Sequence, residues 1–331
     1  MGDLSMRFSI MFLASALAIT GCKQNDAGQT GVDAAGSGSG SGTAAFSVRS
    51  SDIMLMPGEE TTKCYYFHTP NTTAVPITKW TSHMTPGSHH MIMFFASENS
   101  GKPDGTVDDN CGLGGSASNV PVWVYAAQTA DQDLQLPTDD GTGMPLAQLV
   151  PAGQAAVFQM HYLNASDSPA TVHVELNAYA LDAAAAYTPT AAYITYHNGI
   201  TIGPNQVGAV ATGNCNAPTG VKFWTVSSHS HKQSVHTQIN DGSNIVFQSD
   251  DWEHPGAKNW DSLPFYTFTN PKLTFSCTYN NNNQNDPNHL TTIHSGQSAV
   301  MDEMCMATGY IFPATQFKGC VCISDTSCFS M

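Results

Sequence analysis

Two pairs of histidines and one methionine-rich segment are the residues of this chain with the clearest capacity for chemistry. Ser88-His89-His90-Met91 holds one pair, Ser228-His229-Ser230-His231 holds the other, and Met301-Asp302-Glu303-Met304-Cys305-Met306 supplies thioethers. Imidazole and thioether together form a soft ligand set that suits copper, above all in its reduced state. Because the two pairs stand in separate halves of the chain, the sequence predicts a protein with two metal sites.

The second pair has the spacing of a metal site carried on a β-strand. Residues i and i+2 of a strand project from the same face, and their backbones lie about 6.5–7 Å apart. His229 and His231 can therefore converge on one ion, with a methionine from farther along the chain as third ligand. Spacing alone leaves Met301, Met304 and Met306 as rivals, and core packing is the ordinary role of a methionine.

The first pair needs an irregular backbone, because adjacent residues of a regular strand point to opposite faces. His89 and His90 can reach one ion only at a strand start or a kink, which the preceding segment Thr85-Pro86-Gly87-Ser88 can supply. His161, in an aromatic and apolar setting, is a third candidate, and three imidazoles would suit copper or zinc. Since imidazole must be neutral to bind metal, we expect release as the pH falls through about 6.5. The remaining histidines are expected to be surface or packing residues: His68, His83, His173, His197, His236, His254, His289 and His294.

The chain opens with the pattern of an export signal. Arg7 precedes an apolar run from Phe8 to Ile19 that is too short to span a bilayer. The five residues that end at Cys22 resemble a bacterial lipobox, so residues 1–21 are expected to be a lipoprotein signal peptide and Cys22 to carry a lipid. Lys23 is, by resemblance to Gram-negative sorting rules, typical of the outer membrane. Residues 22–45 have a Gly/Ser-rich centre and are expected to form a flexible tether in the cell envelope.

The composition restricts the kinds of partner that the chain can bind after this tether. The net charge is -15 and 11% of residues are charged. Nucleic acid is excluded as a partner, since phosphate contacts need a basic face; we expect a monomeric body with an uncharged polar surface. Eight cysteines remain after Cys22, and an even count behind an export signal predicts four disulfides without fixing their pairing. These are Cys64, Cys111, Cys215, Cys277, Cys305, Cys320, Cys322 and Cys328.

Short β-rich runs separated by turn signals fill the body, and no long amphipathic helix is evident. This density of strands predicts an all-β protein built from sandwiches. Size and a break in the strand rhythm near residues 182–190 predict two consecutive antiparallel β-sandwich domains, 46–186 and 187–331. The polar tract Asn280–Asp286 is expected to be a loop. The expected strands are Lys63–His68, His90–Phe95, Val122–Ala126, Ala156–Leu163, Thr171–Tyr179, Ala191–His197, Lys222–Val226, Val235–Ile239, Asn244–Gln248, Lys272–Cys277 and Gly309–Phe312.

The order of the motifs resembles the copper type II, ascorbate-dependent monooxygenases, the family of peptidylglycine α-hydroxylating monooxygenase and dopamine β-monooxygenase. His89-His90-Met91 resembles the pair at the first copper, Gln159-Met160-His161-Tyr162 the segment with its third ligand, and His229-Ser230-His231 the motif at the second copper. Cys277-Thr278-Tyr279-Asn280 and Glu303-Met304-Cys305 resemble the disulfide-linked segments that bring the methionine ligand. The likeness covers roughly residues 46–318.

The resemblance implies two jelly-roll-like β-sandwich domains, with one copper on each and a solvent-filled cleft between them. By similarity, the copper at His89, His90 and His161 stores an electron. The copper at His229, His231 and Met304 reacts with O2 and hydroxylates a C–H bond of a small substrate. Ascorbate or another one-electron reductant supplies the electrons. Gln159 matches a position proposed to lie on the route between the coppers, and is otherwise a polar strand residue.

The resemblance also implies a disulfide pattern. It pairs Cys277 with Cys305 and Cys64 with Cys111. Cys215 is then left to one of three cysteines near the end of the chain, and the other two to each other. These three are Cys320, Cys322 and Cys328.

Substrate identity is where the residues depart from the family. Ser227, Met306 and Thr308 stand where the peptidylglycine enzyme has the Arg, Asn and Tyr that anchor its substrate. Without the cationic anchor, a glycine-extended peptide is not expected to be the substrate. Two other functions stay open: a non-catalytic copper-binding or copper-handling lipoprotein, and a zinc hydrolase that uses the three-histidine site alone.

Overall fold

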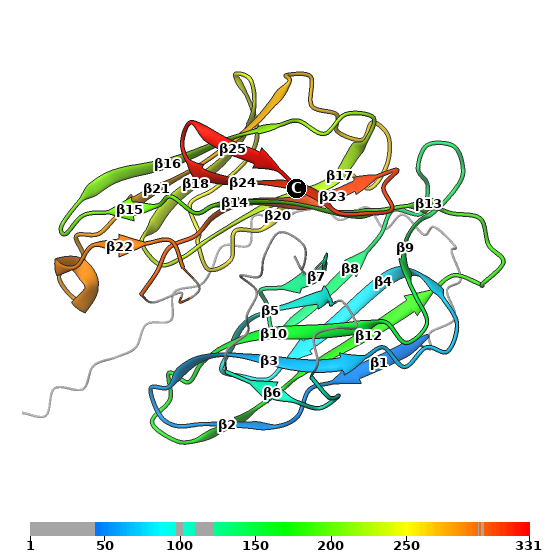
Figure 1. Ribbon diagram of the computed structural model, residues 1–331, viewed down its shortest axis with the longest axis horizontal. Helices are drawn as coiled ribbons and strands as arrows, with labels where there is room; N and C mark the ends of the chain where they lie inside the picture. Colours follow the sequence, from blue (N-terminus) through cyan, green and yellow to red (C-terminus); the bar gives the residue numbers. More distant parts are fainter. Residues whose placement is uncertain (1–43, 97–101, 110–121, 297, 299–300) are drawn as a thin grey trace, which may run out of the picture. The chain divides into compact units, whose positions relative to one another are not determined.

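The computed structural model describes residues 44–96, 102–109, 122–296, 298 and 301–331 and consists mainly of strands (Figure 1). The all-β prediction is confirmed, since the one helical segment of these ranges is the 3-10 turn Pro287–Leu290. No helix in the described ranges has the length and apolarity that crossing a membrane requires. The signal peptide, Cys22 and nearly all of the predicted tether lie outside the described residues.

The first thirteen strands pair only with one another, and we refer to them as the N-terminal strand set. One sheet has the order β1-β12-β4-β9-β13, with β8 also paired to β4, and a second has the order β6-β3-β10-β5-β7. A two-stranded sheet, β11-β2, completes the set. Its strands are β1 (Phe46–Arg49), β2 (Ile53–Leu55), β3 (Glu60–His68), β4 (Val75–Met84), β5 (Ser88–Phe95), β6 (Val107–Asp108), β7 (Val122–Ala127), β8 (Asp131–Gln135), β9 (Leu146–Val150), β10 (Ala155–Leu163), β11 (Ala170–Val172), β12 (Val174–Ala180) and β13 (Thr188–Pro189).

The two larger sheets of the N-terminal strand set pack face to face. Trp80 of β4 and Phe158 of β10 belong to one buried cluster, and the Trp80 ring lies 6.1 Å from that of Tyr125 on β7. Because side chains alternate along a strand, Phe158 and Met160 enter this core. The intervening Gln159 and the following His161 therefore project from the opposite face of the sheet, where they are still buried.

The remaining strands form the C-terminal strand set, which again pairs only within itself. A six-stranded sheet has the order β20-β17-β23-β14-β24-β25, and a four-stranded sheet has the order β16-β21-β18-β19. Pairing is antiparallel throughout the described strands except for β13 with β9 and β14 with β24. The strands are β14 (Ala191–His197), β15 (Thr201–Ile202), β16 (Val207–Asn216), β17 (Lys222–Ser230), β18 (Ser234–Asp241), β19 (Asn244–Ser249), β20 (Ala257–Asn259), β21 (Lys272–Asn280), β22 (Ile293–His294), β23 (Cys305–Phe312), β24 (Lys318–Ser324) and β25 (Ser327–Ser330).

Disulfides tie the sheets of the C-terminal strand set together. Cys277 on β21 bonds Cys305 on β23, so this bridge joins the four-stranded sheet to the six-stranded one. The cysteines near the end of the chain pair as Cys215–Cys320 and Cys322–Cys328, which resolves the alternative that the sequence left open. Cys64 is disulfide-bonded, and its predicted partner Cys111 lies outside the described residues.

The two strand sets also share a buried core. Met306 and Tyr310 of β23 belong to the same apolar cluster as the N-terminal sheets, and the Tyr310 hydroxyl donates to the Val124 carbonyl on β7 at 3.0 Å. Residues Gly40–Met331 accordingly form one compact unit. The division into domains at residue 186 stays a prediction; the change from one set of sheets to the other falls between Pro189 and Ala191.

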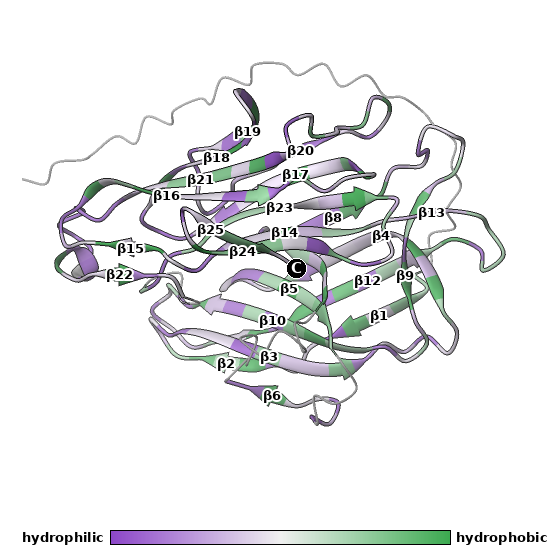
Figure 2. Ribbon diagram, turned by 45° about the horizontal axis from the view of Figure 1, so that its top comes forward, coloured by the Kyte–Doolittle hydropathy of each residue, from purple (hydrophilic) through white to green (hydrophobic). Residues whose placement is uncertain are grey.

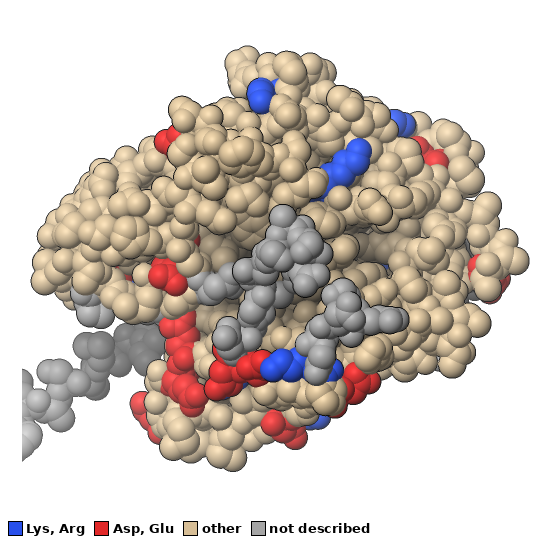
Figure 3. Space-filling model, viewed as in Figure 1, with Lys and Arg blue, Asp and Glu red and all other residues tan. Residues whose placement is uncertain are grey.

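Polarity follows the layers. Figure 2 shows hydrophobic and hydrophilic residues alternating along many strands, the pattern of strands with one buried face. In the face drawn in Figure 3 most atoms belong to residues without charge. This agrees with a charged content of only 11%.

Candidate metal centre

A β-bulge brings the adjacent histidines His89 and His90 to the same site. In the ladder of β10 with β5, His161 pairs with His90 but Tyr162 pairs with Ser88, so His89 is the extra residue. A bulge places two residues opposite one and redirects a side chain that would otherwise point to the far face. The preceding turn contains Gly87 at φ +97°, a backbone conformation that residues other than glycine rarely adopt. The predicted irregularity at the start of this strand is therefore present.

The nitrogens of His89, His90 and His161 converge. One nitrogen from each lies within 4.8 Å of the others, and each ring of the trio lies 5.1 to 5.3 Å from its neighbours. The Nδ1 atoms of His89 and His90 face each other at 3.0 Å. Two nitrogens bound to one ion at about 2.0–2.1 Å would lie about 3 Å apart. The three histidines can thus hold a metal ion.

His161 has the hydrogen-bond pattern of a metal ligand. Its Nε2 lies 2.7 Å from Oε1 of Glu60, at the start of β3, whereas its Nδ1 is buried with no hydrogen-bond partner. A carboxylate behind one ring nitrogen fixes the ring and leaves the other nitrogen free to bind a metal. A buried polar atom without a partner is costly, and a metal ion bound to Nδ1 would remove that cost. The unpaired Nδ1 of His161 therefore indicates that these residues fit a metal ion.

The second pair lies at the end of β17 with both rings on one face. The ladder with β23 pairs His229 with Met306 and ends at Ser230 with Cys305, so His231 and Met304 each lie one residue beyond its end. Opposite residues of an antiparallel ladder share a face. Met306 therefore lies on the same side as His229, while Cys305 turns the other way into its disulfide. Met306 is fully buried, Met304 is half-buried, and Met301 is exposed over 56% of its surface. Met304 as the ligand stays a prediction.

The backbone of Asp302 and the carboxylate of Glu303 hold this second site in place. Nδ1 of His231 donates to the Asp302 carbonyl oxygen at 3.0 Å, which leaves the lone pair of that ring on Nε2. Glu303 is fully buried and accepts from the backbone N–H groups of His231, Gln233 and Met304 at 3.0, 2.6 and 3.2 Å. Burial raises the pKa of Glu303 to about 8 despite these donors. One carboxyl group thus fixes the backbone on both sides of the predicted His–Met site.

Burial keeps all five histidines neutral. It lowers the pKa of His89 and of His231 to about 4, and lowers those of His90 and His229 well below the ordinary value. The neighbouring rings add to the effect, because a second positive charge nearby is unfavourable. Burial also lowers the pKa of His161, against the opposing effect of Glu60. Neutral imidazole is the form that binds a metal.

The expected solvent-filled cleft between the two sets of ligands is not found at the histidines. The rings of His90 and His229 lie 5.4 Å apart, nearly as close as the rings within each set, which lie 5.1 to 5.3 Å apart. Gln128, just after β7, places its side-chain Nε2 2.9 Å from Nδ1 of His229. In the reverse direction, Trp252 from the loop after β19 stacks on His89, with ring centroids 5.5 Å apart.

Other residues singled out in the sequence lie elsewhere. Gln159 is buried one pleat away from His161 on the same face of β10. His236 contacts Asp250 and Gln238, and His294 contacts Thr201, so both have the ordinary role expected of them. Three further residues at the site, Gln128, Trp252 and Glu60, carry no local motif. They come from loops and strand ends whose positions follow from the tertiary fold.

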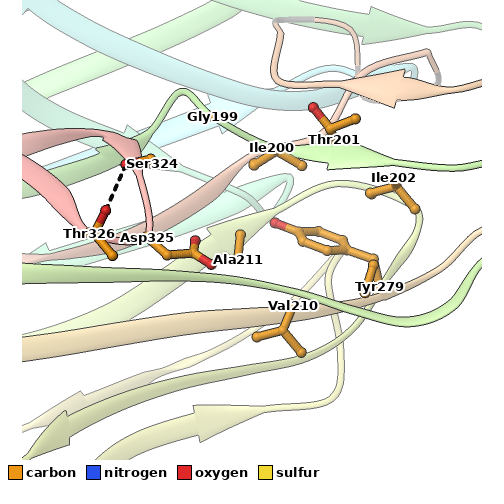
Figure 4. Close-up of a pocket in the computed structure, with 11 residues that line it drawn as sticks. Gly199, Ile200, Thr201, Ile202, Val210, Ala211, Tyr279, Ser324, Asp325 and Thr326 are labelled. Atoms are coloured by element: carbon orange, nitrogen blue, oxygen red, sulfur yellow. Dashed lines mark hydrogen bonds between the residues drawn. The ribbon is translucent and has the colours of Figure 1, made fainter.

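Two further features lie near but outside the centre. Cys215, Cys320 and Cys322 are close enough to suggest a metal site, but their disulfides account for the proximity. A pocket of about 390 Å³ opens between β15, β16 and the β24–β25 turn, and none of the five histidines lines it (Figure 4). Tyr279 lines this pocket and donates its hydroxyl to the Met304 carbonyl at 2.9 Å.

Comparisons with known proteins do not indicate a function for this chain. No family model and no curated protein matches the chain. The major capsid protein P2 of bacteriophage PM2 is similar with a TM-score of 0.30 and 8% identity, over 80% of this chain and 97% of that one. PNGase F, a glycosylasparaginase from Flavobacterium meningosepticum, is similar with a TM-score of 0.32 and 9% identity, over 86% and 99%. Likenesses this weak carry no functional argument.

Proposed function

We propose that this chain is a copper-dependent monooxygenase that hydroxylates a C–H bond of a small substrate. O2 is the oxidant, and ascorbate or another one-electron donor is the reductant. One observation supports this above the others: a buried group of three neutral histidines lies against a His-x-His strand, and Met304 directly precedes the strand paired with it. The metal, the reaction and the resemblance to the copper monooxygenases are parts of the proposal.

The ligand types favour copper over zinc. Structural and catalytic zinc sites use histidine, cysteine and carboxylate ligands, and a thioether adds little for that ion. A thioether is soft and suits copper in the reduced state. With His229, His231 and Met304 at one site and His89, His90 and His161 at the other, bound copper would supply one-electron chemistry at two adjacent positions.

The protein's own residues prepare the site for that chemistry. Glu60 orients the His161 ring, the Asp302 carbonyl orients His231, and Glu303 fixes the backbone that carries Met304. The reaction balances when O2 and a C–H substrate take up two electrons and two protons to give an alcohol and water. Two molecules of a one-electron donor would supply the electrons.

A specific observation keeps the non-catalytic alternative in view. Ser227 and Met306, at two positions where the family anchors substrate, offer no charge, and Met306 is buried in the core. A copper-handling lipoprotein would need the same histidines but no substrate anchor. Both functions place the protein at the cell envelope through a lipid on Cys22, which a Cys22→Ser variant should release into the soluble fraction.

The deciding experiment measures metal and reaction together. Purified protein should contain two coppers per chain, and 18O from labelled O2 should appear in a hydroxylated product when ascorbate and a panel of small neutral or amine substrates are supplied. Two coppers with ascorbate-driven O2 uptake but no labelled product would favour copper handling. One zinc per chain would contradict both.

A further inference from the structure

A side chain from each strand set contacts a predicted metal ligand of the other set. Three contacts show this: His90 with His229, Gln128 with His229, and Trp252 with His89. None of them lies within a single strand set: His89, His90 and Gln128 belong to the first, whereas His229 and Trp252 belong to the second.

Gln128 is placed to select the binding nitrogen of His229. Its backbone N–H donates to the Gln132 side chain at 3.1 Å, so the residue is held at the end of β7. In the structure, the amide nitrogen of Gln128 faces Nδ1 of His229. Turning the amide by 180° about its last torsion puts the oxygen there instead, where it accepts from Nδ1–H and leaves Nε2 as the nitrogen with a lone pair. His229 is 7% exposed and is reached by this side chain from the opposite strand set. Gln128 is therefore a positioning residue for a site to which its own strands contribute no ligand.

Trp252 makes the reciprocal contact. Its ring lies nearly parallel to that of His89, at 24°, and covers a ring whose Nε2 is buried without a hydrogen-bond partner. The loop that carries it is braced by Asp251, whose Oδ1 accepts from the backbone N–H groups of Glu253 and His254 at 3.0 and 2.8 Å. The bulged His89, the least regular of the ligands, thus depends on the C-terminal strand set for its packing.

We propose that the two ligand sets form one interlocked centre, in which Gln128 positions His229 and Trp252 positions His89. Two copper ions held by these ligands would be close enough to interact magnetically, because the His90 and His229 rings lie 5.4 Å apart. The inference rests on the proposed copper binding and deepens it. It assigns both residues to the metal centre and makes the integrity of each site depend on the other strand set.

Electron paramagnetic resonance of the protein loaded with two copper(II) ions tests the spacing. We expect dipolar broadening and a half-field transition in the wild type, both absent from a His161→Ala variant that holds one copper. A spectrum that is the plain sum of two isolated copper(II) centres, with two coppers confirmed by metal analysis, would overturn the interlock and leave the proposed hydroxylation standing. Failure to bind copper at all would overturn both.

Variants of the positioning residues test their roles separately. Gln128→Ala should lower copper affinity at the His229 site by about 10- to 100-fold, the usual effect of losing a group behind a ligand, and should weaken the half-field signal. Gln128→Glu, which can still accept from Nδ1–H, should restore both. Trp252→Ala should weaken binding at the His89 site, whereas Trp252→Phe keeps the stack and should not. Equal copper affinities and unchanged spectra in both alanine variants would contradict the proposal.

Discussion

His90 and His229 belong to strands that never pair with each other, yet their imidazole rings lie 5.4 Å apart. The shared apolar cluster that contains Met306, Tyr310 and Phe158 explains how the two strand sets are held together. The consequence is a single buried region in which five histidines and a nearby methionine meet. Predictions about either half of the centre can therefore be made from the packing of the other.

The assignment of the thioether can be tested by substitution. Met304→Ile keeps an apolar side chain of similar size, so we expect the melting temperature to change little and hydroxylation to be lost. Met301→Ile is the matched control, because Met301 is exposed and stands four residues before Cys305, where the ladder with His229 ends. Full activity in Met304→Ile would show that another residue is the ligand.

The three-histidine site should empty without disturbing the second. His161→Ala removes the ligand with the orphaned Nδ1 and should reduce copper content from two to one per chain, measured by elemental analysis. Glu60→Gln keeps the shape but weakens the hydrogen bond behind His161, and should lower copper affinity at this site by about 10- to 100-fold. Unchanged affinity in Glu60→Gln would show that the carboxylate does not support the ligand.

Acid should release the metal at a lower pH than free histidine would suggest. In the folded chain burial lowers the pKa of His89 and of His231 to about 4, so protons compete for these nitrogens only as the pH approaches that value. Copper should therefore stay bound at about pH 5.5 and leave toward pH 4, rather than leaving near the ordinary value of about 6.5. Copper retained on a desalting column over a pH series measures this. A release midpoint near pH 6.5 would contradict the buried, neutral histidines.

The same pKa values predict how the metal-free chain responds to pH. Unfolded histidines take up protons below about pH 6.5. Burial lowers the pKa of His89 and His231 to about 4 and also lowers those of His90, His161 and His229, so stability should fall as the pH drops below about 6.5. Glu303 acts in the opposite sense, because its raised pKa favours the folded state as the pH falls below about 8. Five histidines outweigh one carboxyl group. Urea titrations at pH 7 and pH 5 should show lower stability at the acidic value.

The turn before the bulge offers a stability test with its own control. Gly87 has φ +97°, and a Cβ atom there would lie 3.3 Å from Cγ1 of Val172. Gly87→Ala should cost about 1–2 kcal/mol and reduce copper at the His89 site. Gly153→Ala is the control. Gly153 also has a positive φ, +55°, but it lies in the turn that leads into β10, away from the bulge, and a Cβ there meets nothing within 4 Å. Gly153→Ala should destabilise the chain to a similar or smaller degree and leave copper content unchanged.

The strand pattern predicted much of the fold and the histidine spacing predicted much of the centre. The i, i+2 relation of His229 and His231 follows from strand geometry, and the kink at His89 was required by the adjacency of two histidines. The strands Val75–Met84 and Val207–Asn216 were missed, because their mixture of polar and apolar residues hides the alternation. In the strand expected at Thr171–Tyr179, His173 interrupts the pairing and divides it into β11 and β12.

The other contacts of the site depend on how the sheets pack, which joins residues far apart in the sequence. No local pattern could show that Gln128 reaches His229 or that Trp252 covers His89, since each pair is joined only by the way the sheets pack. Nor could the expected gap between the two sets of ligands be judged from residues 89–90 and 229–231 alone. The substrate could not be predicted from the sequence either, because Ser227 and Thr308 indicate only which substrate anchors of the family are absent.

X-ray absorption spectroscopy of the copper(I)-loaded protein tests the central claim most directly, since it detects sulfur bound to copper. We expect a copper–sulfur component beside the histidine nitrogens in the wild type and in Met301→Ile, and its loss in Met304→Ile. Spectra with nitrogen ligands only in the wild type, or a sulfur component that persists in Met304→Ile, would contradict a mixed histidine–methionine site.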